Sequence, residues 1–211
     1  MLNFKEDGCE VYEGLLSKET LKLLHTYTFK NKLEFVVTDE HENDIIVPGP
    51  PTMDTYADTL MELLQTTILE KLEERTGLEL VPTYTFYRTY VPGNSLEIHK
   101  DRPSCEISVT ILLDAQYKPD KGYRWEIFVD PEGYRNGGTS SGIGAKQKPG
   151  DGLIYRGCDI PHWREEFLGE EGSYHTQLFC HFIDKNGPNY PKWKYDSRPG
   201  LGFHHSSKKY I

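Results

Sequence analysis

The sequence lacks several features that define broad classes of protein. No stretch approaches the ~20 consecutive apolar residues of a membrane span, and the mean hydropathy is -0.63. We therefore expect a soluble chain with no membrane partner. An excess of basic charge is also missing, because 24 Lys and Arg stand against 33 Asp and Glu, a net charge of -9 at pH 7. Proteins that bind nucleic acid phosphates usually have a basic face or balance, so nucleic acid is disfavoured as a partner.

The sequence also lacks a Cys-x-x-Cys pair, internal repeats and a phosphate-binding loop, and we expect no signal peptide. The four cysteines form no Cys-x-x-Cys pair, and residues 1–7 carry charges where a signal peptide needs an apolar run. We therefore expect a cytoplasmic protein with reduced thiols. Gly-rich residues 133–144 lack the Gly-Lys-Ser/Thr ending of a phosphate loop. This stretch is interpreted as either a lid or a loose connection. Nothing in the sequence indicates an oligomeric state.

The length of 211 residues fits a single domain. A helical support over about residues 15–77 is expected to precede a β-rich core over about 80–184. A C-terminal tail over 185–211 follows, and its basic stretch 204–209 is expected to be a frayed, solvated end.

Two helices are predicted in the support region. Ser17 has the chemistry of an N-cap for the first. The second ends at Gly77 and has apolar residues at 3.6-residue spacing: Ala57, Leu60, Met61, Leu64, Ile68 and Leu72. The opposite face of this helix is polar and is predicted to face solvent: Glu62, Gln65, Glu70, Glu73 and Glu74.

From residue 80 onward the pattern changes to β. Alternating, aromatic or β-branched runs separated by Gly, Pro, Asn and Asp predict short strands over residues 84–90, 106–113, 124–129, 152–156 and 174–183. Helices followed by many short strands indicate an α+β fold, namely an antiparallel barrel or jelly roll with the N-terminal helices packed on one sheet.

A His-x-Asp pair follows one of these regions. In a strand, alternate side chains share a face, so His99 and Asp101 project together while Lys100 points away. An imidazole nitrogen beside a carboxylate oxygen supplies two ligands of a facial triad, which leaves three positions open on iron.

A third ligand is expected from a histidine later in the chain. His162 follows a tight turn and a buried strand, which favours it as this ligand. His175 and His181 are rivals, since they lie on one face of a later strand. The sequence therefore predicts a metal centre made of His99, Asp101 and His162.

These motifs resemble the 2-oxoglutarate/Fe(II)-dependent oxygenases, in particular their prolyl-4-hydroxylase-like branch. The resemblance covers about residues 10–184 and rests on a Tyr-x-Pro-Gly strand, His-x-Asp, Gly-Asp-x-Leu-x-Tyr and a distal His. The matching residues are Tyr90, Pro92, Gly93, His99, Asp101, Gly150, Asp151, Leu153, Tyr155 and His162. The resemblance implies a double-stranded β-helix (a jelly roll) braced by helices.

The resemblance also implies a function. Fe(II), oxygen and 2-oxoglutarate would hydroxylate a C–H bond, with succinate and carbon dioxide as co-products, and ascorbate could serve as a reductant. Tyr90 would bind the cosubstrate. The expected substrate is a peptide, with prolyl residues as the best-known target of the branch, or a small molecule.

One feature of the resembled family is missing, namely the Lys or Arg that holds the far carboxylate of 2-oxoglutarate on the last strand. His175 and Gln177 stand in its place, and Arg164 is a candidate from the preceding loop. Arg88 and Arg124 could serve if their side chains point inward.

Two other functions compete with the oxygenase. A cupin-like metal enzyme would dispense with 2-oxoglutarate, although cupins typically use more His ligands than a His-x-Asp pair offers. A non-catalytic jelly-roll binding module would use His99 and Asp101 as ordinary polar residues.

Overall fold

The computed structural model describes residues 2–34, 46–136 and 141–203. Its α-helices are α1 (Phe4–Asp7), α2 (Lys18–Glu34), α4 (Thr59–Thr76) and α5 (Pro131–Asn136), with 3-10 turns η1 (Pro103–Cys105) and η2 (Lys194–Ser197). Its strands are β1 (Cys9–Tyr12), β2 (Met53–Tyr56), β3 (Leu80–Tyr90), β4 (Leu96–His99), β5 (Ile107–Gln116), β6 (Ile127–Val129), β7 (Ile143–Ala145), β8 (Gly152–Tyr155), β9 (His162–Arg164) and β10 (Tyr174–Asp184).

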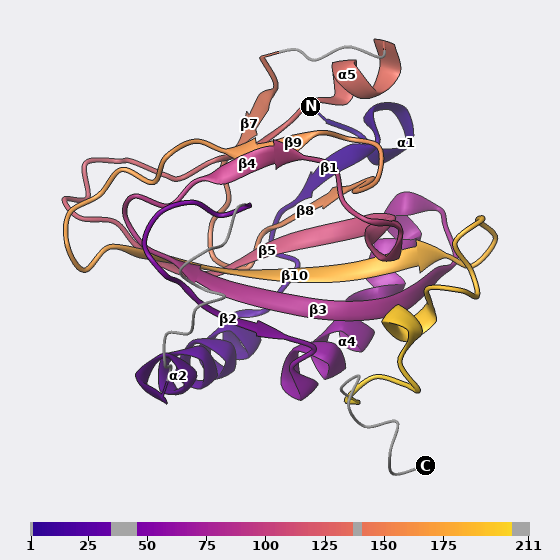
Figure 1. Ribbon diagram of the computed structural model, residues 1–211, viewed down its shortest axis with the longest axis horizontal. Coiled ribbons are helices and arrows are strands. Elements are labelled where there is room, and N and C mark those ends of the chain that lie inside the picture. Colours follow the sequence, from indigo (N-terminus) through magenta and orange to yellow (C-terminus); the bar gives the residue numbers. More distant parts are fainter. Residues whose placement is uncertain (1, 35–45, 137–140, 204–211) are drawn as a thin grey trace.

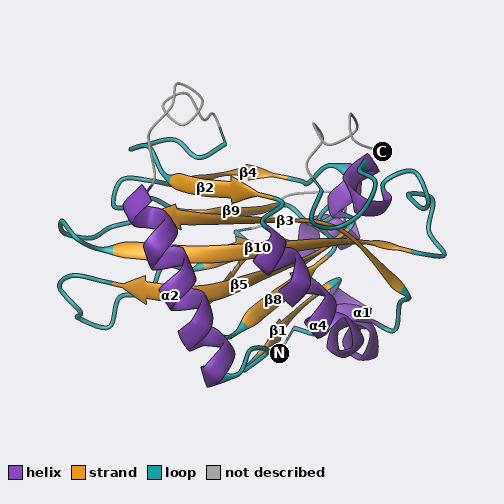
Figure 2. Ribbon diagram, turned by 90° about the horizontal axis from the view of Figure 1, so that it is seen from below, coloured by secondary structure: helices purple, strands orange, loops and turns teal. Residues whose placement is uncertain are grey.

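The strands form two antiparallel sheets that face one another (Figure 1). The larger sheet has six strands in the order β1-β8-β5-β10-β3-β2, and the smaller has four in the order β4-β9-β6-β7. Helices α2 and α4 lie across the outer face of the six-stranded sheet (Figure 2). The mixed α/β fold and the helices on one sheet confirm the coarse prediction.

Side chains alternate along the long strands, so one face of each strand packs against the helices and the other faces the space between the sheets. On β5, Val109 and Ile111 face the helices and join a cluster with Leu24, Met61 and Ile68. Even-numbered residues of the same strand point between the sheets instead, because successive side chains of a strand alternate. Side chains from both sheets therefore line the space between them, and the candidate site lies in that space.

Helix α4 ends at Gly77 as predicted, but it begins at Thr59, so Ala57 lies outside it, and the prediction for its polar face is wrong in part. Asp58 caps it by accepting a hydrogen bond from the Met61 amide, and Gly77 ends it in a left-handed conformation. Glu62 and Gln65, predicted to face solvent, are buried. The Glu62 carboxylate pairs with the buried Arg198 from the C-terminal segment, and such pairing is what permits a buried carboxylate.

Residues 185–203 were predicted to be part of a C-terminal tail, but this segment packs against the fold through contacts of η2 with β3. Asp196 is 4% exposed and accepts two hydrogen bonds from Arg102, at 2.7 and 2.9 Å. It also accepts one from the Tyr56 hydroxyl. Arg102 directly follows Asp101, so this contact fastens the C-terminal segment beside the candidate metal ligands. The basic stretch 204–209 lies outside the described residues.

This contact predicts a pH effect on stability. Burial alone would raise the pKa of Asp196, but the hydrogen bonds from Arg102 and Tyr56 outweigh it and lower the pKa to about 2. A lowered pKa stabilises the fold above the usual value of 3.8, and this contribution disappears as pH falls through about 2. Between those values we expect wild type to lose about 1–2 kcal/mol more unfolding free energy than Asp196→Asn. Urea unfolding curves measure the difference, and parallel losses in both proteins would contradict it.

Several elements differ from the sequence predictions. Residues 133–144 were predicted to be a lid or a loose connection, but α5 ends within them and β7 begins within them. Whether this stretch forms a lid depends on residues 137–140, which lie outside the described residues. The short edge strands β1 and β2 were not predicted. The described part of the chain has no helix that is long and apolar enough to cross a bilayer, and no disulfide joins its cysteines.

Candidate functional site

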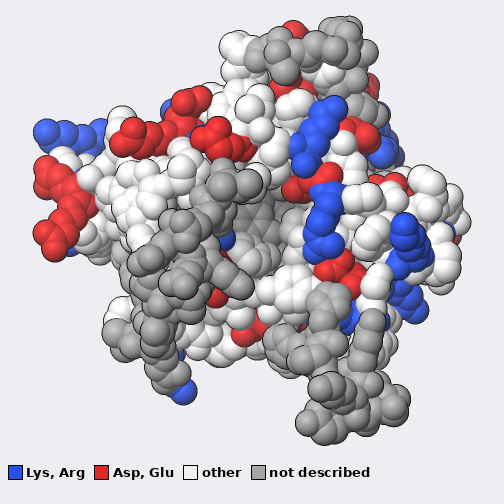
Figure 3. All heavy atoms as spheres, viewed as in Figure 1, with Lys and Arg blue, Asp and Glu red and all other residues white. Residues whose placement is uncertain are grey.

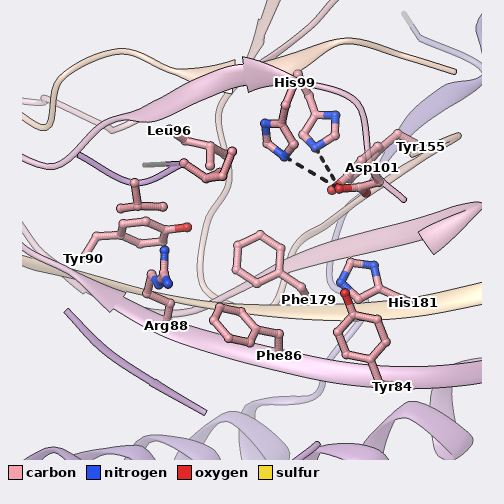
Figure 4. A pocket seen from close by; sticks show the side chains of 13 residues that line it. Tyr84, Phe86, Arg88, Tyr90, Leu96, His99, Asp101, Tyr155, Phe179 and His181 are labelled. Carbon is pink, nitrogen blue, oxygen red and sulfur yellow. Dashed lines mark ion pairs between the residues drawn. The ribbon is translucent and has the colours of Figure 1, made fainter. Parts of the chain in front are cut away.

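A cavity of about 320 Å³ opens between the two sheets. Figure 3 shows the molecule hollowed near the middle of this face, with acidic and basic side chains interspersed around the hollow. Aromatic residues of β3 and β10 line the cavity, together with the candidate metal ligands (Figure 4). The lining residues are Ile46, Val47, Tyr84, Phe86, Arg88, Tyr90, Leu96, His99, Asp101, Tyr155, His162, Phe179 and His181.

The structure brings the three predicted ligands together at this cavity. His99 ends β4 and His162 begins β9, and the two residues are direct partners in the antiparallel pairing of these strands. The Nε2 atoms of His99 and His162 lie 3.7 and 3.6 Å from Oδ1 of Asp101 (dashed lines in Figure 4). These separations exceed hydrogen-bonding distance. One ligand atom from each residue falls within 4.8 Å of the other two, as an ion between them requires.

Both histidines are held in the tautomer that metal binding needs. Nδ1 of His99 donates to the carbonyl oxygen of Glu97 at 2.7 Å, and Nδ1 of His162 donates to that of Ile160 at 3.0 Å. With the proton fixed on Nδ1, Nε2 keeps its lone pair and points toward Asp101. Burial, followed by the nearby His162, lowers the pKa of His99, so its ring is neutral near pH 7.

A buried serine, Ser108, orients Asp101 through a hydrogen bond. The Ser108 hydroxyl on β5 donates to Oδ2 of Asp101 at 3.0 Å and lies 2.8 Å from Nδ1 of His181. Burial alone would raise the pKa of Asp101, but His162, His181 and His99 outweigh it and lower the pKa to about 2. Burial lowers the pKa of His181 to about 4. The Asp101 carboxylate is therefore ionised and the His99 and His181 imidazoles are neutral, and an ionised carboxylate and a neutral imidazole are the forms that bind a metal.

His181 also belongs to a second cluster, formed with Asp101 and Cys105. Burial raises the pKa of the Cys105 thiol, and its sulfur lies 3.1 Å from the Tyr84 hydroxyl. A neutral, hydrogen-bonded thiol is a weak ligand, because the thiolate is the form that binds metals. This chemistry favours the first cluster. The role of Ser108 was not predicted, because a single serine in an alternating strand does not form a recognisable sequence motif.

Gly157 provides close packing around the carboxylate. A Cβ atom at this position would lie 2.3 Å from the carbonyl oxygen of Cys105 and 2.4 Å from Oδ2 of Asp101. The Asp101 amide also donates to the carbonyl oxygen of Gly157 at 2.8 Å. Any larger residue must displace the carboxylate or the backbone.

Gly157→Ala is therefore expected to weaken metal binding by about tenfold or more, the usual cost of disturbing groups that orient a ligand. Calorimetric titration with Mn(II) measures this. The matched control is Gly200→Ala, where the nearest atom to a new Cβ would be 3.6 Å away. A folded Gly157→Ala protein with wild-type affinity would contradict this role.

Arg164 lies two residues beyond His162 on β9, so its side chain points to the same side of the strand. It was expected to reach inward from a loop, whereas it lies in the strand. Its Nη1 donates to the carbonyl oxygen of Trp125 at 2.8 Å, and its guanidinium lies 4.7 Å from that ring's centroid. The residue is 2% exposed, and its Nε and Nη2 have no hydrogen-bond partner. Burial lowers its pKa to about 10, which still leaves it charged at pH 7.

His175 and Gln177 occupy the position where an anchor for the far carboxylate was expected, and they are hydrogen-bonded to each other. Nε2 of His175 lies 2.7 Å from Oε1 of Gln177, and Nδ1 lies 2.9 Å from the Tyr117 hydroxyl. Burial, followed by the charge of Arg164, lowers the pKa of His175 well below its usual value. The His175 ring is thus neutral, and Arg164 is the stronger anion site of the two.

The other two arginines considered from the sequence, Arg88 and Arg124, point in different directions. Arg88 points inward and lines the cavity. The side chain of Arg124 is 42% exposed and pairs with Asp120, so it faces away from the site.

Comparisons with known proteins identify the fold. No family model matches the chain, and no curated protein matches its sequence. Among solved structures, a Pseudomonas putida prolyl-4-hydroxylase is similar, with a TM-score of 0.58 and 13% identity over 84% of this chain and 92% of that one. EctD from S. alaskensis, solved with 2-oxoglutarate and 5-hydroxyectoine, has a TM-score of 0.64 and 14% identity over 93% of this chain and 82% of that one.

A Trichoplax adhaerens prolyl hydroxylase in complex with a hypoxia inducible factor peptide is also similar, with a TM-score of 0.62 and 10% identity over 86% of each chain. The fold of this chain is therefore the one found in 2-oxoglutarate- and Fe(II)-dependent oxygenases, as the motifs indicated.

Proposed function

We propose that the chain is an Fe(II)- and 2-oxoglutarate-dependent oxygenase that hydroxylates a C–H bond. The observation that carries this proposal is the convergence of His99, Asp101 and His162 at the wall of an open cavity. Two imidazoles and one carboxylate form the ligand set typical of non-heme Fe(II) oxygenases. The tautomers and ionisation states described above fit that ion.

The region beyond the triad fits the cosubstrate. Arginine stays charged in proteins, so a buried guanidinium with two unbonded N–H groups favours an anion beside it. Arg164 meets this description and lies on the same strand as His162. Tyr90 lines the cavity, and its ring lies 4.9 Å from that of Trp125, which covers Arg164. Arg164 would therefore hold the far carboxylate of 2-oxoglutarate, and Tyr90 would contact the cosubstrate.

When bound, iron and 2-oxoglutarate would activate dioxygen: one oxygen atom would enter the hydroxylated product and the other would enter succinate as 2-oxoglutarate loses carbon dioxide. The chain's own residues orient and insulate the reaction. Ser108 and Gly157 hold Asp101 in place, and the carbonyl groups of Glu97 and Ile160 fix the two imidazoles. The aromatic rings of β3 and β10 provide an apolar wall that limits access of water.

The sheet order supports the finer description as a double-stranded β-helix. Consecutive strands from β3 to β6 alternate between the two sheets, since β3 and β5 lie in the larger one and β4 and β6 in the smaller one. This alternation is typical of a jelly roll.

The proposal is tested by succinate release from 2-oxoglutarate in the presence of Fe(II), ascorbate and oxygen. Proline-rich peptides, free amino acids and other small carboxylates, and oligonucleotides form the substrate panel. A peptide or small molecule should stimulate succinate release and gain one oxygen atom by mass. A wild-type protein that binds iron but not 2-oxoglutarate would favour the cupin-like alternative, and one that binds neither would favour a binding module.

A further inference from the structure

The Ser108 hydroxyl, which holds the Asp101 carboxylate, has more hydrogen-bond acceptors around it than its single proton can serve. Oδ2 of Asp101 lies 3.0 Å from Oγ of Ser108, and the carbonyl oxygen of Cys105 lies 3.2 Å from it. An ionised carboxylate and a carbonyl group can only accept hydrogen bonds. The next neighbour is Nδ1 of His181, at 2.8 Å, which can either donate to the hydroxyl or accept from it.

The position of the imidazole proton therefore decides where the serine proton goes. With a proton on Nδ1, His181 donates to Oγ of Ser108, and the hydroxyl is free to donate to Asp101. With a bare Nδ1, the hydroxyl would turn to the ring, and the carboxylate and the Cys105 carbonyl would both face serine lone pairs in a buried place, which is unfavourable. The Tyr155 phenol also bonds to Ser108. It does not change this result, because a serine oxygen can accept two hydrogen bonds.

The sheet holds the His181 ring beside Ser108. The two residues are direct partners in the antiparallel pairing of β10 with β5, so their side chains lie on the same face. The Gln65 side chain donates to the backbone carbonyl of His181 at 2.6 Å, and the centroid of the Tyr84 ring lies 4.5 Å from that of the imidazole (Figure 4). His181 is 5% exposed. The ring is therefore packed in the one place from which Nδ1 reaches the hydroxyl.

The two oxygen atoms of the Asp101 carboxylate have different surroundings. Oδ1 lies 3.7 and 3.6 Å from the Nε2 atoms of His99 and His162, which is the side where an ion would lie. Oδ2 accepts the hydrogen bond from Ser108. The serine proton thus occupies Oδ2 and leaves Oδ1 directed toward the two histidines.

We propose that His181 is a positioning residue of the metal centre, whose Nδ1–H group directs the Ser108 proton onto Oδ2 of Asp101. This inference rests on the metal site of the proposed function and adds to it a residue that supplies no ligand. Hydrogen bonds behind metal ligands orient them, and the loss of such a partner typically weakens metal binding by about 10–100-fold.

Calorimetric titration with Mn(II) compares two substitutions of this histidine. His181→Leu fills much of the space of the ring without a donor, and we expect it to bind Mn(II) about tenfold more weakly or worse. His181→Asn places an amide N–H group close to the position of Nδ1, so it should recover most of the affinity. The matched control is Cys180→Ala, because Cys180 is the neighbouring residue on β10 but packs in the core beneath the helices. It should keep the wild-type affinity.

A double variant tests whether His181 acts through Ser108. Ser108→Ala alone should weaken Mn(II) binding, and the addition of His181→Leu should weaken it no further, because both changes remove the same interaction. A further tenfold loss in the double variant would overturn the inference, since His181 would then act independently, as a ligand in the second cluster would. Wild-type affinity in His181→Leu, or an asparagine variant as weak as the leucine variant, would overturn it too.

A measurement on the wild-type protein keeps the test decisive if a variant does not fold. Nitrogen-15 spectra of the histidine rings in the Zn(II)-loaded protein should show the proton of His181 on Nδ1. A proton on Nε2 with a bare Nδ1 would overturn the inference. Wild type that binds Mn(II) but no 2-oxoglutarate would contradict the proposed function and leave the role of His181 intact, whereas wild type that binds no Mn(II) would overturn both.

Discussion

Replacing His99, Asp101 or His162 by alanine is expected to reduce iron affinity about 100-fold or more and to reduce succinate formation to background. Each residue supplies one of three ligand atoms that lie within 4.8 Å of one another. Ligand bonds account for most of the free energy of metal binding at such sites, so the loss of one in three is severe. Metal content after dialysis and succinate release measure the two effects.

Two controls distinguish the proposed metal site from alternatives. His25→Ala removes a half-exposed histidine that pairs with Asp114 on the outer face, and should leave iron content unchanged. Cys105→Ser tests the second cluster, formed by Asp101, Cys105 and His181, and should also retain iron. Retention of iron by His99→Ala together with its loss from Cys105→Ser would place the metal in the second cluster.

Replacing Arg164 by methionine is expected to weaken 2-oxoglutarate binding by about 100-fold or more. Breaking a buried charge pair by removing one partner usually costs about 3–5 kcal/mol, and Arg164 is the buried cation with N–H groups available for the far carboxylate. Metal affinity should change little, because Arg164 is not among the candidate ligands. Calorimetric titration of the Mn(II)-loaded variant with 2-oxoglutarate measures the change.

The same substitution should have a small effect on stability in the absence of 2-oxoglutarate. Methionine removes two unpaired donors from the interior, which offsets the lost contacts to Trp125. Arg124→Met is the matched control, since its side chain is 42% exposed, and it should leave both properties unchanged. A protein that loses several kcal/mol of unfolding free energy on Arg164→Met but keeps its 2-oxoglutarate affinity would show that Arg164 is purely structural.

Local patterns were sufficient to predict the long strands and to predict which residues come together as candidate metal ligands. His99 and Asp101 share a face because strand geometry fixes the direction of alternate side chains, and that rule needs no tertiary information. The long strands β3, β5 and β10 contain enough alternating residues for their pattern to be clear. The short strands β1 and β2 were missed because four residues at a sheet edge are too few to establish a period.

Features that depend on distant segments could not be predicted. Glu62 is buried because Arg198, far along the chain, reaches the same point, and nothing near Glu62 in the sequence indicates that partner. Arg164 was expected to reach inward from a loop, but it lies in strand β9, which forms by pairing with the distant strands β4 and β6. Ser108 orients Asp101 only because β5 passes behind the candidate metal ligands.

The most direct test of the account is anaerobic titration of the Fe(II)-loaded protein with 2-oxoglutarate, followed by visible absorption. Chelation of Fe(II) by 2-oxoglutarate gives a charge-transfer band. The account predicts that this band saturates at one equivalent in wild type, is absent in Asp101→Ala and needs a far higher 2-oxoglutarate concentration in Arg164→Met. An iron-loaded wild-type protein that develops no band at any 2-oxoglutarate concentration would contradict the account.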